Sequence, residues 1–199
     1  MVCFPIPLNS PILAAEDYLA LPRSAENWLI KPILPASGSM LLYGDPKVGK
    51  SYAALQLALT LTGKGPPDWF GFPLTQPGRV VYVQLDTPRS LWAERLEALK
   101  AAGHPIDALE LADRETLETW PFDILNPDHE RLLRSALAPI KPTAVIIDTL
   151  KESNSAEENS NTEMTQAINR LIAATQPAAL VLVAHAKKPN EWGPDTRND

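Results

Sequence analysis

Short apolar runs alternate with longer amphipathic stretches along most of this chain. Five runs rich in β-branched, aromatic or other apolar residues predict strands, some of them covered on both faces. These predicted strands span residues 40–43, 79–85, 108–112, 144–148 and 179–184. The stretches between them predict helices from 53 until Gly63, from Pro88 to about 102, at 128–137 and at 163–175. Strands that alternate with helices predict a mostly parallel sheet in a three-layer α/β/α fold.

Two segments break this alternation. Residues 1–35 predict an irregular arm that contains one short helix at 13–21 and packs on a core spanning 36–199. Residues 151–162 are rich in Ser, Asn and Glu, which predicts an exposed, mobile loop. The 20 prolines cluster near both termini and at 66–77, where they mark extended connections rather than the interiors of elements.

Composition narrows the class of protein. A length of 199 residues with 45% hydrophobic and 21% charged residues is that of one globular domain. A net charge of −6 argues against a strongly basic nucleic-acid binder, although it leaves room for a local basic groove. The single cysteine, Cys3, excludes an internal disulfide and a cysteine cluster for zinc, which indicates a reducing compartment.

Export and membrane insertion are not expected. The first sixteen residues contain no Lys or Arg, so they lack the charged region that begins a signal peptide. The longest apolar runs, such as 178–184, fall far short of the roughly 20 residues that span a bilayer. We therefore expect a cytoplasmic protein without a membrane partner.

A glycine-rich loop between the first predicted strand and helix carries the strongest functional signal. It fits the pattern G-x-x-x-x-G-K-[ST], in which glycines let backbone N–H groups face phosphates and the helix adds its positive N-terminal end. Lys50 supplies a charge to the β- and γ-phosphates of ATP, and the Ser51 hydroxyl is a natural Mg²⁺ ligand. An ordinary surface turn is the alternative. The predicted nucleotide-binding residues are Gly44, Asp45, Pro46, Lys47, Val48, Gly49, Lys50, Ser51 and Tyr52.

Asp148 is the polar end of the near-continuous apolar strand at 144–148. A carboxylate in this position can hold Mg²⁺ through water opposite Ser51. The alternative is an ordinary strand-end or helix-capping aspartate. Thr149 follows Asp148 where a glutamate could have stood, so a carboxylate that polarises the attacking water must come from elsewhere.

Together these features resemble the RecA/DnaB-like superfamily of ATPases, and most closely its RepA-like plasmid and phage branch. The likeness covers most of residues 28–188. It is carried by residues 28–30, 34–35, the glycine-rich loop, 69–73 with 78–80, 86–89 with Arg95-Leu96, 145–150, and the strand that ends at His185. The resemblance implies the motor domain of a helicase or DNA-dependent ATPase that replicates a phage, plasmid or other mobile element. It also implies single-stranded DNA as a partner and a hexameric ring in which a neighbouring subunit supplies an arginine finger.

Two more residues become candidates at this point. In RecA-like ATPases the glycine-rich loop is the phosphate-binding loop, or P-loop, and the water-activating acid lies on the strand after the helix that follows it. This implies Asp86 as the general base. Asp86 could instead cap the helix that Pro88 opens. His185 follows an apolar strand, so its ring could reach the γ-phosphate and report the nucleotide state to Lys187 and Lys188. A partly buried structural histidine is the alternative.

The remaining basic residues give weaker signals. Lys187, Lys188 and Arg197 could contact DNA or the nucleotide of a neighbour, but a short basic cluster is more often only solvated. Arg89 and Arg95 lie on a predicted outer helix, and we expect them to be surface charges.

The chain departs from the family in two places. Leu85-Asp86 stands where relatives commonly show Glu-Asp, so Asp86 would replace the usual acid only in part. The chain stops at Asp199, before the family's Arg-Gly-Ser-like loop, and we expect a truncated core.

Three other functions stay open. They are a recombination or regulatory ATPase that unwinds nothing, an assembly module with vestigial hydrolysis, and a P-loop phosphotransferase, for which residues 151–162 would be a poor lid.

Overall fold

The structure is a computed structural model that describes residues 12–21, 27–117, 122–156 and 160–186. Its central sheet has five strands, and each neighbouring pair runs parallel. In spatial order the strands are β3 (Ser39–Gly44), β9 (Ala179–His185), β8 (Ala144–Asp148), β6 (Val80–Gln84) and β7 (Leu109–Asp113). The strand that leads into the glycine-rich loop therefore lies at one end of this sheet, with β9 between it and β8.

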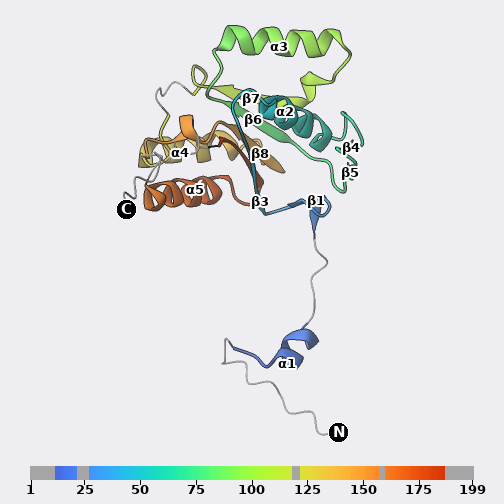
Figure 1. Ribbon diagram of the computed structural model, residues 1–199, viewed down its shortest axis with the longest axis vertical. Helices are drawn as coiled ribbons and strands as arrows, with labels where there is room; N and C mark the ends of the chain where they lie inside the picture. The colour runs from blue at the N-terminus through green and yellow to red at the C-terminus, as the bar shows by residue number, and fades with distance from the viewer. Residues whose placement is uncertain (1–11, 22–26, 118–121, 157–159, 187–199) are drawn as a thin grey trace, which may run out of the picture.

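Helices cover both faces of the sheet (Figure 1). One face carries α2 (Lys50–Leu61) and α3 (Arg89–Ala101), and the other carries α4 (Pro127–Leu137) and α5 (Asn161–Thr175). A short 3-10 helix, η1 (Ile106–Ala108), precedes β7. The expected three-layer α/β/α fold with a parallel sheet is confirmed. None of the helices in the described ranges is long and apolar enough to cross a bilayer.

Two helices start earlier than predicted. α5 begins at Asn161, two residues early, because Ser160 is its N-cap and accepts a hydrogen bond from the backbone N–H of Glu163. α2 begins at Lys50, directly after its N-cap Gly49. The glycine-rich loop therefore passes into the helix without an intervening turn.

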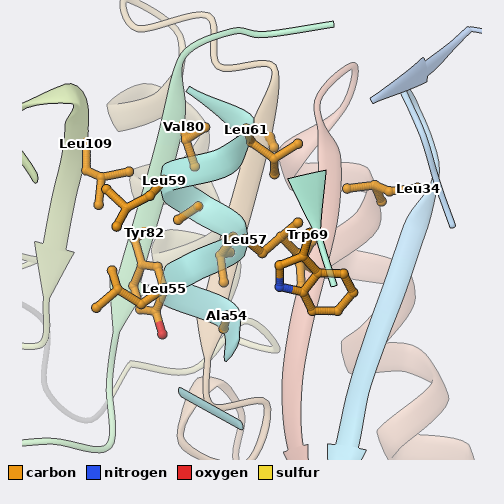
Figure 2. Close-up of a cluster of buried hydrophobic side chains, with 14 of the residues drawn as sticks. Leu34, Ala54, Leu55, Leu57, Leu59, Leu61, Trp69, Val80, Tyr82 and Leu109 are labelled. Carbon is orange, nitrogen blue, oxygen red and sulfur yellow. The ribbon is translucent and has the colours of Figure 1, made fainter. Parts of the chain in front are cut away.

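Two separate apolar layers flank the sheet because side chains alternate along each strand. Val80, Tyr82 and Ile146 contact the α2 layer, whereas Val81 and Ile147 contact the α4 and α5 layer. Figure 2 shows the α2 layer, in which Leu55 and Leu59 of the helix lie beside Tyr82 of β6. Each large apolar side chain buried in this way contributes about 1.5–3 kcal/mol to folding. The same alternation directs the last residues of β6 and β8 toward the α2 side.

A short hairpin, which the sequence pattern did not predict, forms within the expected N-terminal arm. β1 (Trp28–Ile30) and β2 (Leu34–Pro35) pair antiparallel. Leu29, Ile30 and Leu34 are fully buried against the α2 layer, so this part of the arm packs on the core. Earlier in the arm, α1 (Ala15–Ala20) buries none of its own residues, and Figure 1 draws it apart from the sheet.

A second unpredicted hairpin lies in the proline-rich stretch. β4 (Asp68–Trp69) and β5 (Phe72–Pro73) pair antiparallel through a turn in which Phe70 has a φ of 50° and Gly71 a φ of 83°. The indole N–H of Trp69 donates to the carbonyl oxygen of Ala53 at 2.9 Å. The hairpin therefore packs against α2 through the buried side chain of Trp69.

The segment after β8 is partly buried and makes more hydrogen bonds than its composition predicts. It contains a 3-10 helix, η2 (Lys151–Ser153), whose last residue is fully buried. The carboxylate of Asp123 accepts hydrogen bonds from the backbone and the hydroxyl of Ser155. The backbone N–H of Ile124 donates to the Ser153 carbonyl oxygen at 2.9 Å. The expectation of exposure is therefore wrong for Ser153, which the contacts with residues 123 and 124 help to bury, whereas Lys151 and Ser155 are exposed as expected. The mobility of the loop stays a prediction, and residues 157–159 lie outside the described ones.

Candidate functional site: a phosphate loop beside a buried carboxylate

Parallel strands bring polar residues to one edge of the sheet. The carboxyl ends of neighbouring parallel strands meet at the same edge, where ligands of open α/β sheets commonly bind. The last residues of β3, β6, β8 and β9 at this edge are Gly44, Gln84, Asp148 and His185. The pairing register places Gly44 opposite His185, and Gln84 opposite Asp148. The glycine-rich loop, Asp148 and His185, predicted separately from the sequence, therefore meet here.

The glycine-rich loop presents an uncapped helix end. Gly49 has a φ of 92°, in the left-handed region that glycine adopts at little cost, and Lys47 has a φ of 66°. Asp45, Pro46, Lys47, Val48 and Gly49 are all exposed. Within the described chain no side chain accepts a hydrogen bond from the first turn of α2, so those N–H groups are left for another acceptor. An anion is the acceptor that a helix N-terminus favours.

Lys50, the first residue of α2, is drawn inward and is only 7% exposed. Its ammonium donates to the carbonyl oxygens of Gly44 at 2.9 Å and Asp45 at 2.7 Å, and lies 3.1 Å from Nδ1 of His185. Because an ammonium only donates, Nδ1 is the acceptor and the ring proton belongs on Nε2. Three acceptors thus satisfy the three donors of Lys50, and a phosphate at this loop must take the place of at least one of them.

His185 is joined to the loop through its main chain as well as its ring. The ring is exposed at the end of β9, and the following backbone N–H, that of Ala186, donates to the Gly44 carbonyl oxygen at 2.8 Å. The end of β9 therefore contacts the glycine-rich loop and Lys50 through both its main chain and its last side chain.

Asp148 is fully buried at the end of β8. Its Oδ2 accepts hydrogen bonds from the Tyr82 hydroxyl at 2.8 Å and from Nε2 of Gln84 at 3.1 Å. Its Oδ1 is buried too, and among the described side chains it is a polar atom without a hydrogen-bond partner. Burial, and then the charge of Asp148 and its hydrogen bond, raise the pKa of Tyr82 well above its ordinary value. Tyr82 therefore stays a neutral donor, and the carboxylate keeps one oxygen without a donor.

This donor set fits Mg²⁺. Mg²⁺ is commonly held by one or two carboxylates together with substrate phosphates, rather than by a cage made only of protein atoms. Over the part of the chain that the structure describes, no cluster of three His, Cys, Asp or Glu side chains forms such a cage. The Tyr82 hydroxyl, which donates to Asp148, lies 3.5 Å from the carbonyl oxygen of Ser51. Ser51, whose hydroxyl is the predicted Mg²⁺ ligand, therefore lies close to the Asp148 carboxylate.

Asp86 lies just beyond the end of β6 and is exposed. Its backbone N–H, like that of Thr87, donates to Oε1 of Gln84, at 2.9 and 3.1 Å respectively. The N-cap of α3 is Pro88, and in the described structure no side chain caps this helix end. No hydrogen bond in the described structure thus supports the alternative that Asp86 caps α3. The carboxylate of Asp86 is open to solvent, at the edge of the sheet where the glycine-rich loop lies.

Comparison with known proteins bears on the family and the fold of this chain. A protein-family model described as an AAA domain matches residues 6–191, nearly the whole chain. The chain belongs to the AAA domain family. Its fold is similar to that of the KaiC-like protein PH0186 from the hyperthermophilic archaeon Pyrococcus horikoshii OT3, with a TM-score of 0.51 and 16% sequence identity. The match covers 83% of this chain and 71% of that one. This AAA domain is therefore a P-loop ATPase domain with a RecA-like fold, and P-loop ATPases generally bind ATP with Mg²⁺.

Sequence reasoning missed Tyr82 and Gln84, which complete the acidic half of the AAA domain's site. Both are fully buried, and they come from a strand whose apolar character suggested only packing. A signal was present, because Gln84 is a polar residue at the last position of a buried strand. Its importance depends on the register that sets it opposite Asp148, and a single strand's sequence does not show that register.

Other predicted charges have more partners than expected. Arg89 makes a two-pronged ion pair with Asp113, with both N···O distances at 2.7 Å, and lies 3.1 Å from a carboxylate oxygen of Glu115. The guanidinium of Arg95 lies 5.6 Å from the ring centroid of Tyr52, whose side chain is 59% exposed. The predictions for Lys187, Lys188 and Arg197, and for Cys3, concern residues outside the described ones.

One sizeable cavity lies away from this site. It has a volume of about 490 Å³ between the C-terminal ends of α4 and α5, at the opposite edge of the sheet. Arg134, Lys141 and Thr175 are among its lining residues. The candidate site therefore lies not at this cavity but at the polar edge where β3, β8 and β9 end.

Proposed function

We propose that this AAA domain is the ATP-hydrolysing motor domain of a RepA-like helicase or DNA-dependent ATPase. The observation that carries the hydrolytic part is the pairing at one sheet edge of a phosphate loop with a buried carboxylate that has one oxygen unused. In this proposal the loop binds the polyphosphate, and the carboxylate suits the cation that accompanies the polyphosphate. The helicase part is supported by the sequence's resemblance to the RepA-like branch.

In this proposal the loop residues bind and orient ATP. The N–H groups from Gly49 onward surround the phosphates, and Lys50 leaves its carbonyl acceptors for the β- and γ-phosphates. Ser51 and Asp148 Oδ1 face the cation. When bound, Mg²⁺ neutralises charge that develops on the phosphate oxygens.

Asp86 is the proposed general base. It accepts a proton from the water whose oxygen attacks the γ-phosphorus, while the bond to the β,γ-bridging oxygen breaks and ADP leaves. Its exposed position after β6 supports this role, because water must reach it. Leu85 stands where relatives commonly have Glu, and only the following Asp86 is left to activate water, which predicts slow turnover in the isolated chain. His185 is the proposed sensor, because a γ-phosphate that draws Lys50 away releases its ring.

Coupling to DNA is the step that rests most on the family. We propose that six copies form a ring around single-stranded DNA, with nucleotide between subunits. The segment at 151–156 follows Asp148 directly, which suits a loop that responds to the nucleotide. Glu152 in this segment disfavours tight contact with DNA phosphates, so we place the DNA contact on other residues of the ring.

ATP hydrolysis by the wild type and by Lys50→Ala tests the proposal, with and without single-stranded DNA and over a range of protein concentrations. Lys64→Ala is the matched control, because Lys64 is an exposed lysine just beyond the other end of α2. Turnover that needs Lys50 and rises with DNA supports a motor, and strand displacement then separates a helicase from a recombination ATPase. Nucleotide binding without turnover overturns hydrolysis, and turnover indifferent to DNA overturns the motor.

A further inference from the structure

Gln84 lies between a group that needs a hydrogen-bond donor and two groups that need an acceptor. Its side chain is fully buried at the end of β6. On one side Nε2 donates to Oδ2 of Asp148, and on the other Oε1 accepts from the backbone N–H groups of Asp86 and Thr87. One side chain thus joins the buried carboxylate of β8 to the segment that carries the proposed base.

An amide is the side chain that these neighbours require. The carboxylate of Asp148 only accepts hydrogen bonds, and backbone N–H groups only donate. A bridge between them must donate at one end and accept at the other. Glutamate would set two carboxylates against each other, lysine would leave the N–H groups without an acceptor, and methionine would serve neither side.

Tyr82 provides a natural comparison. Its hydroxyl donates to the same oxygen of Asp148, at 2.8 Å, yet its other neighbour is the carbonyl oxygen of Ser51 rather than the Asp86 segment. Tyr82 and Gln84 therefore both orient the carboxylate, while Gln84 additionally contacts the segment after β6.

We propose that Gln84 is a positioning residue that couples the state of the Asp148 carboxylate to the placement of Asp86. The proposal deepens the ATPase function proposed above and rests on it for its catalytic consequence. Because Gln84 is buried, its amide cannot turn toward solvent to absorb a change at Asp148. A shift of the carboxylate when its free oxygen engages a cation is therefore passed through the amide to the N–H groups of Asp86 and Thr87.

Amide hydrogen exchange and ¹⁵N-resolved NMR test the link itself. In Gln84→Met the Asp86 and Thr87 N–H groups should exchange about tenfold faster than in the wild type, because they lose their acceptor. The Leu85 N–H donates to the backbone oxygen of Asp148 at 2.6 Å and should be unaffected. Tyr82→Phe should leave all three unchanged. Equal protection in Gln84→Met and the wild type would overturn the proposal.

Adding ADP with and without Mg²⁺ tests the coupling without any turnover. In the wild type, Mg²⁺ with ADP should shift the Asp86 and Thr87 signals, and ADP with a chelator should not. In Gln84→Met the shift should disappear at these two residues while signals of the glycine-rich loop still respond. If Gln84→Met does not fold, Gln84→Leu serves instead: it likewise removes both the donor to Asp148 and the acceptor of the two N–H groups. A Mg²⁺-dependent shift that survives in that variant overturns the proposal.

The catalytic consequence is a split between kcat and KM. Gln84→Met should lower kcat for ATP about 10–100-fold, with KM within about threefold, as expected when the residue that holds a reacting group is lost. Gln166→Met, at an exposed position of α5, should leave both unchanged. A raised KM with unchanged kcat would overturn the role. A wild type that binds Mg²⁺ and ADP but hydrolyses nothing refutes the ATPase function, whereas the exchange and NMR results still decide the link.

Discussion

Lys50, on the proposed phosphate side of the candidate site, and Asp148, on its proposed metal side, are both buried, but they differ in how many of their hydrogen-bonding atoms have partners. Lys50 is 7% exposed, and each of its three donors has an acceptor. Asp148 is 0% exposed, and only one of its two oxygens accepts hydrogen bonds in the described structure. The Lys50 ammonium thus has an acceptor for every donor, whereas Oδ1 of Asp148 has no donor among the described residues.

This difference assigns different tasks to the two sides. If the loop binds phosphate as proposed, Lys50 exchanges one set of acceptors for another, so we expect it to contribute orientation with a modest net gain in binding free energy. A buried carboxylate oxygen without a donor costs about 1–3 kcal/mol. A cation that reaches Oδ1 relieves that cost. We therefore expect phosphate chemistry to depend most on Lys50, and the benefit from Mg²⁺ to depend on Asp148.

The largest effect should come from removing the charge on the phosphate side. Lys50→Ala should lower ATP turnover by about 10²–10³-fold, because one preorganised donor to the developing charge is commonly worth that much. Steady-state hydrolysis measures it, with Lys64→Ala as the control. If Lys50→Ala kept more than about a tenth of the wild-type rate, the loop would not be the phosphate site.

The next effect isolates the metal side. Asp148→Asn should lower turnover about 10–100-fold and should abolish the gain in nucleotide affinity that Mg²⁺ gives the wild type. The variant should still fold, because an amide oxygen can accept from Tyr82 and Gln84 while a buried charge is removed. Titration calorimetry with ADP, with and without Mg²⁺, measures the gain. A Mg²⁺ effect that persists in Asp148→Asn would mean that the unused oxygen is not the metal ligand.

Much of this arrangement follows from local sequence. Residues 144–148 were predicted as a strand and form β8 without a change at either end, because a run of Ala, Val and Ile has little other way to be buried. The glycine-rich loop is a contiguous motif, so its place between strand and helix needs no tertiary information. His185 was placed by the strand that it ends.

The rest depends on contacts between distant segments. Gln84 and Asp148 are 64 residues apart, and only the parallel register makes them neighbours. The hairpin at 28–35 has strands of two and three residues, which are too short for a periodic pattern. The hydrogen bonds of Ser155 go to Asp123, a residue of a different segment. Composition describes a segment's own chemistry and not the partner that holds it.

A smaller effect on nucleotide affinity is expected from the contact between Lys50 and His185. In His185→Ala, Lys50 loses one of its three acceptors, and a phosphate then has less to displace. ADP should therefore bind about two- to fivefold more tightly, the equivalent of part of one hydrogen bond. If His185 also senses the γ-phosphate, ATP turnover should fall several-fold at the same time. His104→Ala, at an exposed position beyond α3, is the control. Weaker ADP binding in His185→Ala would show that the ring assists the phosphate rather than competing with it.

The smallest effect on turnover should come from the outer support of the Asp86 segment, the ion pair between Arg89 at the start of α3 and Asp113 at the end of β7. Hydrogen bonding from Arg89, assisted by Thr116, lowers the pKa of Asp113 to about 2. A folded-state pKa below the unfolded one adds stability that is present above about pH 4 and is lost as the pH falls toward 2.

Asp113→Asn should therefore reduce the free energy of unfolding by about 1 kcal/mol near neutral pH, a value kept small because Arg89 is partly exposed and screened by solvent. The difference from the wild type should shrink below about pH 4, and turnover should change less than about twofold. Urea unfolding at several pH values measures this, with Asp107→Asn, an exposed aspartate of η1, as the control. A large loss of turnover with little loss of stability would show that α3 itself, and not only Gln84, sets the position of Asp86.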